Sequence, residues 1–244
     1  MPKVSIVIPT KNEEKNLPSL LHSIKAQTFT DIEIIVADAG STDQTAQLAS
    51  SLGAKVVEGG MPGPGRNRGA KAATGDIIIF FDADVYLPTS RFLEDSIAEM
   101  ERKQLDIATC KVKPMSRKPI DKIGHEVYNA YALMTEKIRP HAPGFCIFVR
   151  RATHEAIGGF DEGVVFAEDH EYVQRAEKNG ARFGLLRSHP IAVSVRRLEK
   201  DGRLAIAFKY IYSEFHMLTK GSFKEMPFEY EMGGKDTKEE EEKK

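Results

Sequence analysis

Short apolar runs alternate with segments of helical periodicity along the first third of the chain. Runs rich in Val, Ile and Phe are typical of strands that are buried on both faces of a sheet. Between them, apolar residues recur every three or four positions, as along Leu17, Leu20, Leu21 and Ile24. The predicted strands are 3–8, 33–37, 55–57 and 77–81, and the predicted helices begin near Asn12, after Asp43 and at Arg66, with a Gly- and Pro-rich loop over 59–65.

This alternation with short connections predicts a three-layer α/β/α sandwich, Rossmann-like, with a mainly parallel sheet. The pattern continues through the second half of the chain. The elements predicted there are a helix through 92–100 capped by Thr89 or Ser90, a strand at 106–112, a helix at 119–138, a strand at 145–149, a helix at 168–176, short strands at 182–186 and 191–195, and a helix at 203–219.

The predicted strand 77–81 runs directly into two aspartates, Asp82 and Asp84. Ligands of open α/β sheets bind outside the carboxyl ends of the strands. Two carboxylates held close together repel each other, and a hard divalent cation relieves that repulsion. We therefore predict that Asp82 and Asp84 hold a metal and, through it, a phosphorylated substrate. The alternative is a solvated acidic turn.

Three further polar clusters follow predicted strands or open predicted helices, at 10–13, 38–43 and 168–169. The carboxyl ends of parallel strands lie on one edge of a sheet, so these groups can converge although they are distant in sequence. Simpler interpretations exist: Asp38 and Ser41 as cap and turn residues, and Glu168–Asp169 as favourable charge at a helix N-terminus. Convergence of all four clusters favours a shared site.

Composition excludes some classes of function. The chain has 244 residues and a net charge of −1, which gives no general attraction to nucleic acid. Cys110 and Cys146 lack the spacing of a disulfide framework or a thiolate zinc site. No apolar run approaches the ~20 residues that span a bilayer, and the first residues predict a strand rather than a signal peptide. We expect a cytoplasmic protein, with peripheral contact at the cytoplasmic membrane face left open.

Four stretches form an ordered set of motifs: Ile8–Glu13, Asp38–Asp43, Gly65–Asp84 with its Phe81-Asp82-Ala83-Asp84 end, and Gly158–Glu162 followed by Glu168–Asp169. As a set they resemble the motifs of the family-2 nucleotide-sugar glycosyltransferases, whose fold is GT-A and whose third motif is called DXD. The resemblance covers about residues 3–200. It implies a hexosyltransferase that uses a UDP- or GDP-sugar with Mn²⁺ or Mg²⁺.

The resemblance also implies roles on the donor side. Asp38 would accept hydrogen bonds from the nucleotide base, Asp84 would ligate the metal directly, and Asp82 would lie near ribose and metal. Arg66 would contact the phosphates, unless it is a solvated surface arginine. The implied nucleotide-sugar residues are Pro9, Thr10, Asn12, Glu13, Asp38, Ser41, Arg66, Asp82 and Ala83, with Arg197 and His189 as candidates to complete the diphosphate site, although a lone histidine before proline also suits a structural role.

On the acceptor side, Asp169 matches the catalytic base of an inverting transfer, which takes the acceptor's proton on the face opposite the leaving group. Glu168 would orient the acceptor. The implied acceptor-binding residues are Gly144, Gly159, Phe160 and Asp161. Two departures matter: Ala39 stands where a second acidic residue is frequent, and only Arg197 remains of the Q-x-x-R-W motif of processive members, which favours transfer of a single sugar.

We expect a catalytic domain over 1–202, with a nucleotide-sugar-binding half at 1–84 and an acceptor-binding half at 85–202. A helical extension over 203–234 and a disordered charged tail over 235–244 would follow. Charges interrupt 203–223, so this segment would pack on the core, join a homodimer or lie on a membrane surface. The competing functions are a non-catalytic nucleotide-sugar-binding module and a haloacid-dehalogenase-type phosphatase. The base, the sugar and the acceptor, a saccharide or a lipid-linked one, stay open.

Overall fold

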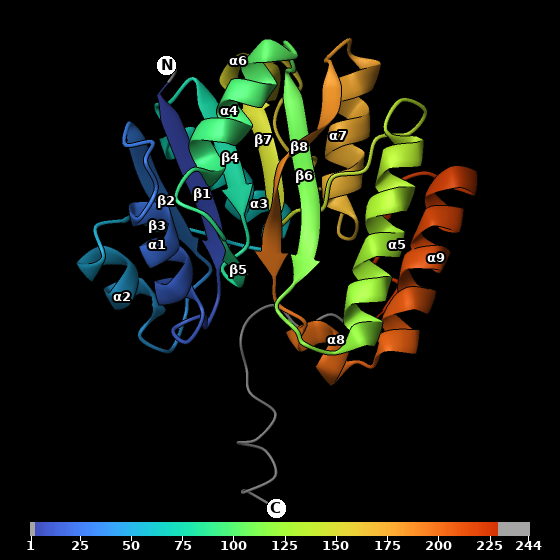
Figure 1. Ribbon diagram of the computed structural model, residues 1–244, viewed down its shortest axis with the longest axis horizontal. Helices are drawn as coiled ribbons and strands as arrows, with labels where there is room; N and C mark the ends of the chain where they lie inside the picture. The colour runs from blue at the N-terminus through green and yellow to red at the C-terminus, as the bar shows by residue number, and fades with distance from the viewer. Residues whose placement is uncertain (1–2, 229–244) are drawn as a thin grey trace, which may run out of the picture.

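The computed structural model describes residues 3–228, which form one mixed sheet with helices on both faces (Figure 1). The predicted tail at 235–244 lies outside the described residues. The strands are β1 (Val4–Thr10), β2 (Ile32–Asp38), β3 (Lys55–Glu58), β4 (Ile77–Phe81), β5 (Val85–Tyr86), β6 (Ile107–Pro114), β7 (Cys146–Arg150) and β8 (Phe183–Val193). The helices are α1 (Leu17–Lys25), α2 (Thr45–Ser51), α3 (Pro62–Ala72), α4 (Phe92–Arg102), α5 (Pro119–Thr135), α6 (Arg151–Ala156), α7 (Glu168–Lys178), α8 (Arg196–Lys200) and α9 (Arg203–Thr219).

The strands follow the order β3-β2-β1-β4-β7-β6-β8-β5. The first four are parallel, as predicted, and their carboxyl ends share one edge: Thr10 of β1 lies beside Asp38 of β2. The second half is mixed, because β7 runs antiparallel between β4 and β6, while β8 is parallel to β6 and antiparallel to β5. The four parallel strands therefore lie on the side of the sheet that carries the predicted clusters at 10–13, 38–43 and 82–84.

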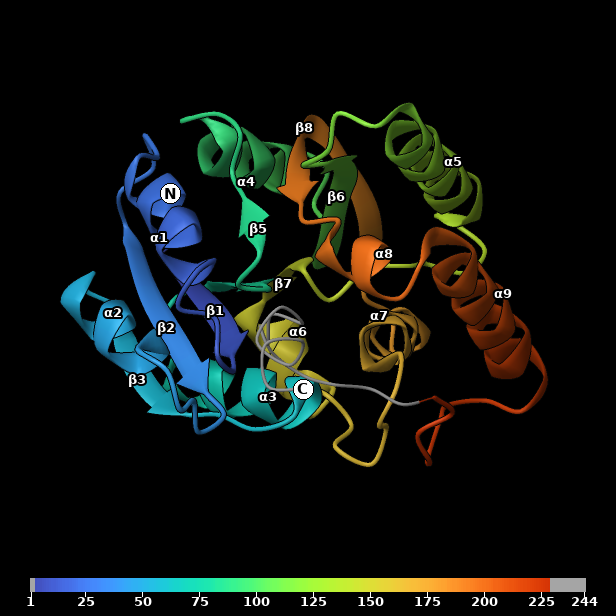
Figure 2. The same ribbon diagram turned by 90° about the horizontal axis from the view of Figure 1, so that it is seen from below.

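Two apolar layers enclose the sheet. On one face, α1, α2 and α4 pack against side chains of β1 and β4 such as Ile6, Ile8 and Phe81. On the other face, α3 and α7 pack against Val7, Ile78 and further residues of β4 and β7. Figure 2 shows these helices on opposite sides of the strands. Alternate residues of one strand thus enter different cores, which explains why the central strands are apolar without interruption.

Several boundaries differ from the prediction for local physical reasons. Helix α3 begins inside the predicted loop, because proline suits the first turn of a helix and Pro62 occupies it. The predicted strands 182–186 and 191–195 form one strand, β8, which pairs with β6 through a register shift near Cys110. Neither Thr89 nor Ser90 caps α4, since Arg91 holds the N-cap position without a side-chain hydrogen bond.

Short elements were missed altogether. Helices α6 and α8 and the two-residue strand β5 are too short to leave a periodic signal. The two cysteines, 36 residues apart, lie buried on the neighbouring strands β6 and β7 with their Sγ atoms 3.1 Å apart, and both are free thiols. Sequence spacing could not reveal this neighbourhood.

Helices α5 and α9 stand side by side at the flank of the molecule (Figures 1 and 2). Helix α5 packs on β6, and α9 lies beyond it, joined by an ion pair between Asp121 and Arg203. The helix predicted within 203–234 thus covers 203–219, after which Phe223 bridges back to Phe166. Within residues 3–228, no helix is both long enough and apolar enough to cross a bilayer.

Candidate functional site

The first part of the site is a pair of interlocked loops after β1 and β2. The carboxylate of Asp38 accepts hydrogen bonds from the backbone N–H of Ser41 (2.9 Å), the Ser41 hydroxyl (2.5 Å) and the Thr10 hydroxyl (3.2 Å). The same Ser41 oxygen accepts the backbone N–H of Asn12 at 2.8 Å. The structure therefore brings Thr10, Asn12, Asp38 and Ser41 together, as predicted.

A left-handed residue fixes the first loop. Asn12 has a φ of 53°, and its side-chain oxygen accepts the backbone N–H of Thr42 at 2.8 Å. Asparagine tolerates this conformation better than most side chains. The next backbone N–H, of Glu13, donates to the Thr45 hydroxyl at 2.7 Å. The two loops thus hold each other in a fixed shape that starts at Pro9 and includes both clusters.

The second part of the site is the turn after β4. The Asp84 side chain is 28% exposed, and its carboxylate lies 3.4 Å from a terminal nitrogen of Arg196. Burial, the neighbouring charge of Asp82 and that of Glu13 raise the pKa of Asp84 to about 6, against the opposing effect of Arg196 and Arg197. The turn therefore concentrates negative charge that the protein itself only partly neutralises.

Arg196 is a site residue that the sequence analysis missed. It bonds both oxygens of the buried Glu13 carboxylate, at 2.9 and 3.3 Å, and so links the first loop to Asp84. The motif comparison selected its neighbour Arg197, which is exposed but close enough to influence the charge on Asp84. Two adjacent arginines, Arg196 and Arg197, were the signal that the sequence offered for this site. The structure shows that Arg196 makes the bridging contacts.

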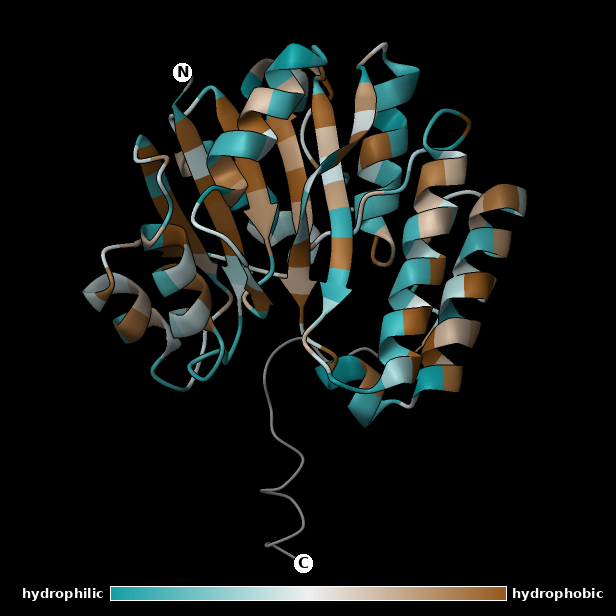
Figure 3. Ribbon diagram, viewed as in Figure 1, coloured by the Kyte–Doolittle hydropathy of each residue, from teal (hydrophilic) through white to brown (hydrophobic). Residues whose placement is uncertain are grey.

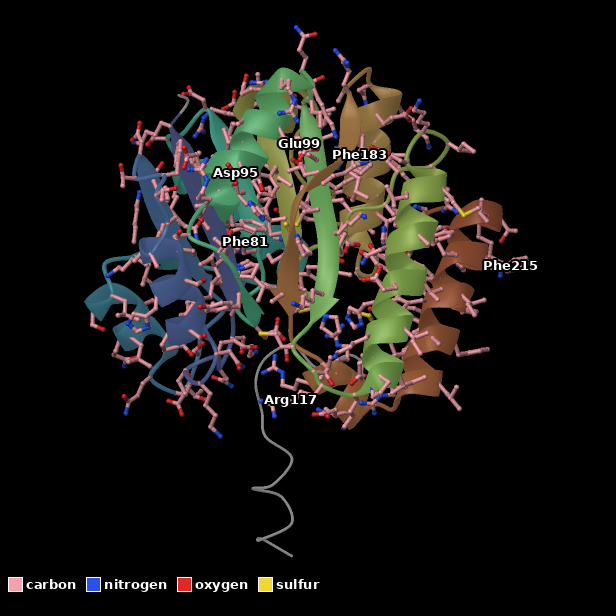
Figure 4. The ribbon with its side chains drawn as sticks, in the orientation of Figure 1. Phe81, Asp95, Glu99, Arg117, Phe183 and Phe215 are labelled. Atoms are coloured by element: carbon pink, nitrogen blue, oxygen red, sulfur yellow. The ribbon has the colours of Figure 1, made fainter. Side chains whose placement is uncertain are left out.

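His189 lies away from these carboxylates. Its imidazole pairs with Asp95 of α4 at 2.8 Å, and Figure 4 shows Asp95 well up the helix layer from the strand ends. His189 lies on β8, five residues before Ser194. The backbone N–H of Ser194 donates to the Asp84 carbonyl. Five strand residues span roughly 16 Å. The structure thus gives His189 the structural pairing that was its alternative interpretation.

The third part of the site is centred on Arg66 of α3. Its guanidinium bonds Asp82 at 2.9 Å through one terminal nitrogen and Glu168 at 2.7 Å through the other. The side chain is only 3% exposed and lies over the ring of Phe160, 5.5 Å from its centroid. Burial opposes the charge, but Asp82, Glu168 and Asp169 outweigh it and raise the pKa of Arg66. The solvated alternative for Arg66 is therefore wrong, and one cation joins the polar cluster at 82–84 to the cluster at 168–169.

Gly144 makes room for this arginine. A Cβ atom at this position would collide with the Arg66 guanidinium. The backbone N–H of Gly144 donates to Asp169 at 2.6 Å. A larger residue would displace both the guanidinium and the loop that holds the Asp169 carboxylate, so the glycine serves two contacts at once.

Asp169 stands in the first turn of α7, yet its contacts are not those of a cap. One oxygen binds Gly144 in the loop before β7, and the other accepts the N–H of its neighbour His170 at 2.8 Å. The N-cap position belongs to Ala167, with a φ of 55° and no side-chain bond. Burial and the charge of Asp169 raise the pKa of Glu168, partly offset by Arg66. The pair Glu168–Asp169 is therefore held toward the centre of the site.

The other predicted acceptor-side residues mostly hold neighbouring segments of the chain in place. Phe160 stacks on Tyr172 with ring centroids 4.0 Å apart and exchanges two backbone hydrogen bonds with the Asn67 side chain. Gly159 has a φ of 73°, and an added Cβ would collide with Asn67. Asp161 faces Lys224, which lies beyond α9. These residues position α3 against the loop before α7.

A group of polar side chains beside Asp169 carried no sequence signal. His141 contacts Glu214 of α9 at 2.9 Å, and its ring lies 5.1 Å from that of His170. The Tyr128 hydroxyl is buried without a hydrogen-bond partner among residues 3–228, and burial together with the charge of Asp169 raises its pKa. The His170 Nδ1 atom likewise lacks a partner in that range. These buried polar atoms lie close enough to Asp169 to be influenced by its charge.

The residues suit a divalent cation that is shared with a substrate. Asp82 and Asp84 offer oxygen ligands, and the raised pKa of Asp84 reflects charge that a cation would neutralise. No group of three or more His, Cys, Asp or Glu side chains within residues 3–228 forms a complete protein cage. Mg²⁺ sites commonly use one or two carboxylates, waters and substrate phosphates. The donor set therefore fits the predicted Mn²⁺ or Mg²⁺.

Comparisons with known proteins agree with this geometry. The chain matches glycosyl transferase family 2 over residues 5–158. Poly(ribitol-phosphate) beta-N-acetylglucosaminyltransferase TarS of Staphylococcus aureus is 29% identical over 197 residues, 76% of this chain and 34% of TarS. The chain thus spans about a third of the length of this curated relative.

Solved structures extend the likeness to the fold. The complex of S. aureus TarS 1–349 with UDP-GlcNAc has a TM-score of 0.66 and 26% identity, covering 80% of this chain and 59% of that one. Mannosyltransferase PcManGT from Pyrobaculum calidifontis, in complex with GDP-Man and Mn²⁺, has a TM-score of 0.73 over 91% of this chain and 65% of that one. At 22% identity, the second likeness concerns the fold alone. The predicted GT-A fold is confirmed.

Proposed function

Because the chain belongs to glycosyl transferase family 2, we propose that it transfers one sugar from a nucleoside-diphosphate sugar to an acceptor hydroxyl. The observation that carries this proposal is the double contact of Arg66. Its guanidinium bonds Asp82 on the donor side and Glu168 on the acceptor side, at 2.9 and 2.7 Å. A metal-bound diphosphate and an acceptor can therefore meet across a short distance.

The donor half, residues 1–84, would hold the nucleotide. Asp38 is an acceptor of hydrogen bonds when ionised, which suits the N–H groups of a base. The interlocked loops with Thr10, Asn12 and Ser41 would line the base and ribose. UDP-GlcNAc in the TarS complex and GDP-Man in the PcManGT complex belong to those proteins, and they make UDP- and GDP-sugars the donors to test first.

Asp84 would ligate the cation, with Asp82 as the ribose-side or water-mediated partner. A divalent cation held by these residues would supply positive charge against the negative charge of the departing nucleoside diphosphate. Arg196 and Arg197 add positive charge beside Asp84 on the diphosphate side. Arg66 has both terminal nitrogens engaged, so its predicted contact with phosphate would require one of them to change partner.

Asp169 would act as the base. The acceptor oxygen attacks the anomeric carbon from the face opposite the diphosphate, its proton passes to the Asp169 carboxylate, and the bond between sugar and phosphate oxygen breaks. This displacement inverts the anomeric centre. Gly144 and His170 fix the carboxylate through their backbone N–H groups. Glu168 would orient the acceptor from its place against Arg66, within the acceptor half at 85–202.

Nucleotide titrations of the metal-free and metal-loaded protein test the proposal. Wild-type protein should bind UDP or GDP, and the corresponding sugars, more tightly when Mn²⁺ is added. Asp84→Asn should abolish this gain, whereas Asp31→Asn, an exposed aspartate before β2, should keep it. Metal-enhanced affinity that survives Asp84→Asn would refute the metal role.

Product analysis separates a transferase from a nucleotide-sugar-binding module. A transferase consumes the donor and releases the nucleoside diphosphate in proportion to the sugar transferred. Binding of the donor without any release, across saccharide and lipid-linked acceptors, would favour the module. Release of inorganic phosphate would indicate a phosphatase instead.

A further inference from the structure

Helix α9 presents its apolar side chains outward. Five large residues at alternating spacings of four and three positions are 63–87% exposed: Leu204, Phe208, Ile211, Phe215 and Leu218. Figure 4 shows Phe215 projecting from the outer side of the helix. A surface helix of a globular protein normally turns such a stripe toward the core. The apolar face of α9 is therefore without a partner among residues 3–228.

The polar side of α9 holds it in this orientation. Arg203 makes two bonds to the buried Asp121 carboxylate, at 2.7 and 3.0 Å. Glu214 contacts both His141 and Arg139, at 2.9 and 3.0 Å. Rotation of the helix to bury its apolar stripe would break both sets of contacts. The outward stripe is thus a fixed feature of the fold.

A second apolar stripe lies on the neighbouring helix α5. Its members are Ile120, Ile123, Val127 and Met134, which are 57–79% exposed. The two helices run in the same direction, because α5 contacts α9 through Asp121–Arg203 near both starts and through Tyr131–Glu214 about three turns later. Figure 3 shows hydrophobic segments along both helices at this flank. Together they form an apolar surface, here called the α5/α9 face, which exceeds the scattered apolar residues usual on a soluble domain.

Exposed cations lie at both ends of the α5/α9 face. Arg117 and Lys122 stand at its beginning, and Lys137 and Lys220 stand at its far end. The exposed acids in and beside these segments are Glu126, Glu199, Asp201 and Glu225. Lys118, Lys200 and Lys224 are exposed there as well, so positive charge still prevails. A second copy of the chain, docked in either direction, would bring basic ends against basic ends, which is unfavourable. An anionic surface complements both ends at once.

We propose that the α5/α9 face binds an anionic lipid bilayer, with both helices lying in the plane of its surface. Apolar side chains enter the boundary between headgroups and acyl chains, and the flanking lysines and arginine contact anionic headgroups. The helices do not need to cross the bilayer, which agrees with their length and polarity. The proposal stands independently of the sugar-transfer activity, since it uses no residue of the carboxylate site.

Vesicle flotation tests the proposal directly. The full chain should float with vesicles of phosphatidylcholine and phosphatidylglycerol, and far less with phosphatidylcholine alone. The triple variant Lys122→Glu, Lys137→Glu, Lys220→Glu should weaken binding by about a hundredfold or more, because each basic residue near the surface contributes about fivefold. The triple variant Lys25→Glu, Lys71→Glu, Lys178→Glu changes the net charge equally at exposed positions elsewhere and should bind like wild type.

A second variant pair tests the apolar part. Phe215→Ser should lower the affinity for anionic vesicles, whereas Met61→Ser, an exposed apolar residue before α3, should not. Thermal melting checks that all variants fold. Failure of the wild type to float, or equal loss in both charge triples, overturns the proposal. A stable dimer in light scattering that does not bind vesicles overturns it in favour of a second copy.

Discussion

The donor and acceptor sides of the site satisfy their polar groups in different ways. On the donor side, Asp38 and Asn12 are bonded by residues of two loops that follow adjacent strands. On the acceptor side, the contacts join distant segments, as between Arg66 and Glu168, and the Tyr128 hydroxyl keeps no hydrogen-bond partner among residues 3–228. An unpaired buried hydroxyl is costly unless a ligand completes it. The donor-side loops thus satisfy one another's polar groups, whereas the acceptor side leaves a buried hydroxyl unpaired among residues 3–228.

The charges differ as well. Arg66 lies between two carboxylates and stabilises the fold around it. Asp84 lies near Asp82 and Glu13, and its raised pKa shows that its charged form is disfavoured without a ligand. The carboxylates that contact Arg66 therefore have a buried cation beside them within the protein, whereas the charge of Asp84 is the one that substrate and metal would neutralise. The following variants separate the two, from the largest expected effect to the smallest.

Asp169→Asn should lower the rate of transfer by about 10²–10⁴-fold, the usual contribution of a general base. Donor affinity should stay at the wild-type value, because the amide oxygen can still accept the Gly144 N–H. Steady-state rates and donor titrations measure the two quantities. Glu177→Gln, at an exposed position of α7, serves as the control. Transfer at the wild-type rate by Asp169→Asn would remove the base from the proposal.

Arg66→Ala should destabilise the fold by about 3–5 kcal/mol, since it leaves two carboxylates facing each other without a buried cation. Urea denaturation measures the free energy of unfolding. Arg68→Ala, two residues away, removes an arginine that is 49% exposed and should cost less than about 1 kcal/mol. Equal losses in the two variants would show that Arg66 does not join the two sides of the site.

Asp84→Asn should stabilise the metal-free protein by about 1–2 kcal/mol at pH 7.5. Burial raises the pKa of Asp84, and partial screening by solvent reduces the free energy that this shift represents. The folded pKa of about 6 exceeds the unfolded value of 3.8, so Asp84 carries no penalty below pH 3.8 and an increasing one as the pH rises through about 6. The gain should therefore vanish in acid. Thermal melts with a chelator, from about pH 4 to 8, measure it. A destabilised variant at pH 7.5 would contradict the assignment of charge strain.

Ser41→Ala should have the smallest effect, a loss of about 1 kcal/mol in stability, because one hydroxyl joins Asp38 to Asn12. Nucleotide affinity should fall with it if the two loops form the base site. Ser51→Ala, at an exposed end of α2, removes a hydroxyl bonded within its own helix and should leave nucleotide affinity unchanged. Calorimetry and denaturation report both values. Unchanged affinity in Ser41→Ala would mean that the loops do not hold the nucleotide.

Local patterns predicted much of the donor side. The uninterrupted apolar run of β4 and the aspartates that follow it are neighbours in sequence, so their placement at a strand end needs no distant contact. The same holds for Asp38 at the end of β2 and for Asp169 at the start of α7. Parallel pairing of β1 with β2 and β4 then placed the clusters at 10–13, 38–43 and 82–84 on one edge of the sheet, as the strand–helix alternation indicated.

Distant contacts decided what the sequence could not indicate. Arg196 reaches Glu13 across 183 positions of sequence, and neither residue has a local pattern that announces the pair. The insertion of β7 antiparallel between β4 and β6 depends on competition among strands for partners. His189 illustrates the converse: a motif position suggested a diphosphate contact, but the register of β8 places it beside Asp95.

The sequence by itself determined most of the segments that form strands and helices, and that carboxylates follow several strands, because periodicity and strand-end chemistry are local. Tertiary structure alone decided that Arg66 joins Asp82 to Glu168, and that the stripe of α9 points outward. A helical apolar stripe has the same periodicity whether it faces a core or another surface. The ion pair of Arg203 with Asp121, 82 positions apart, fixes which face is outside.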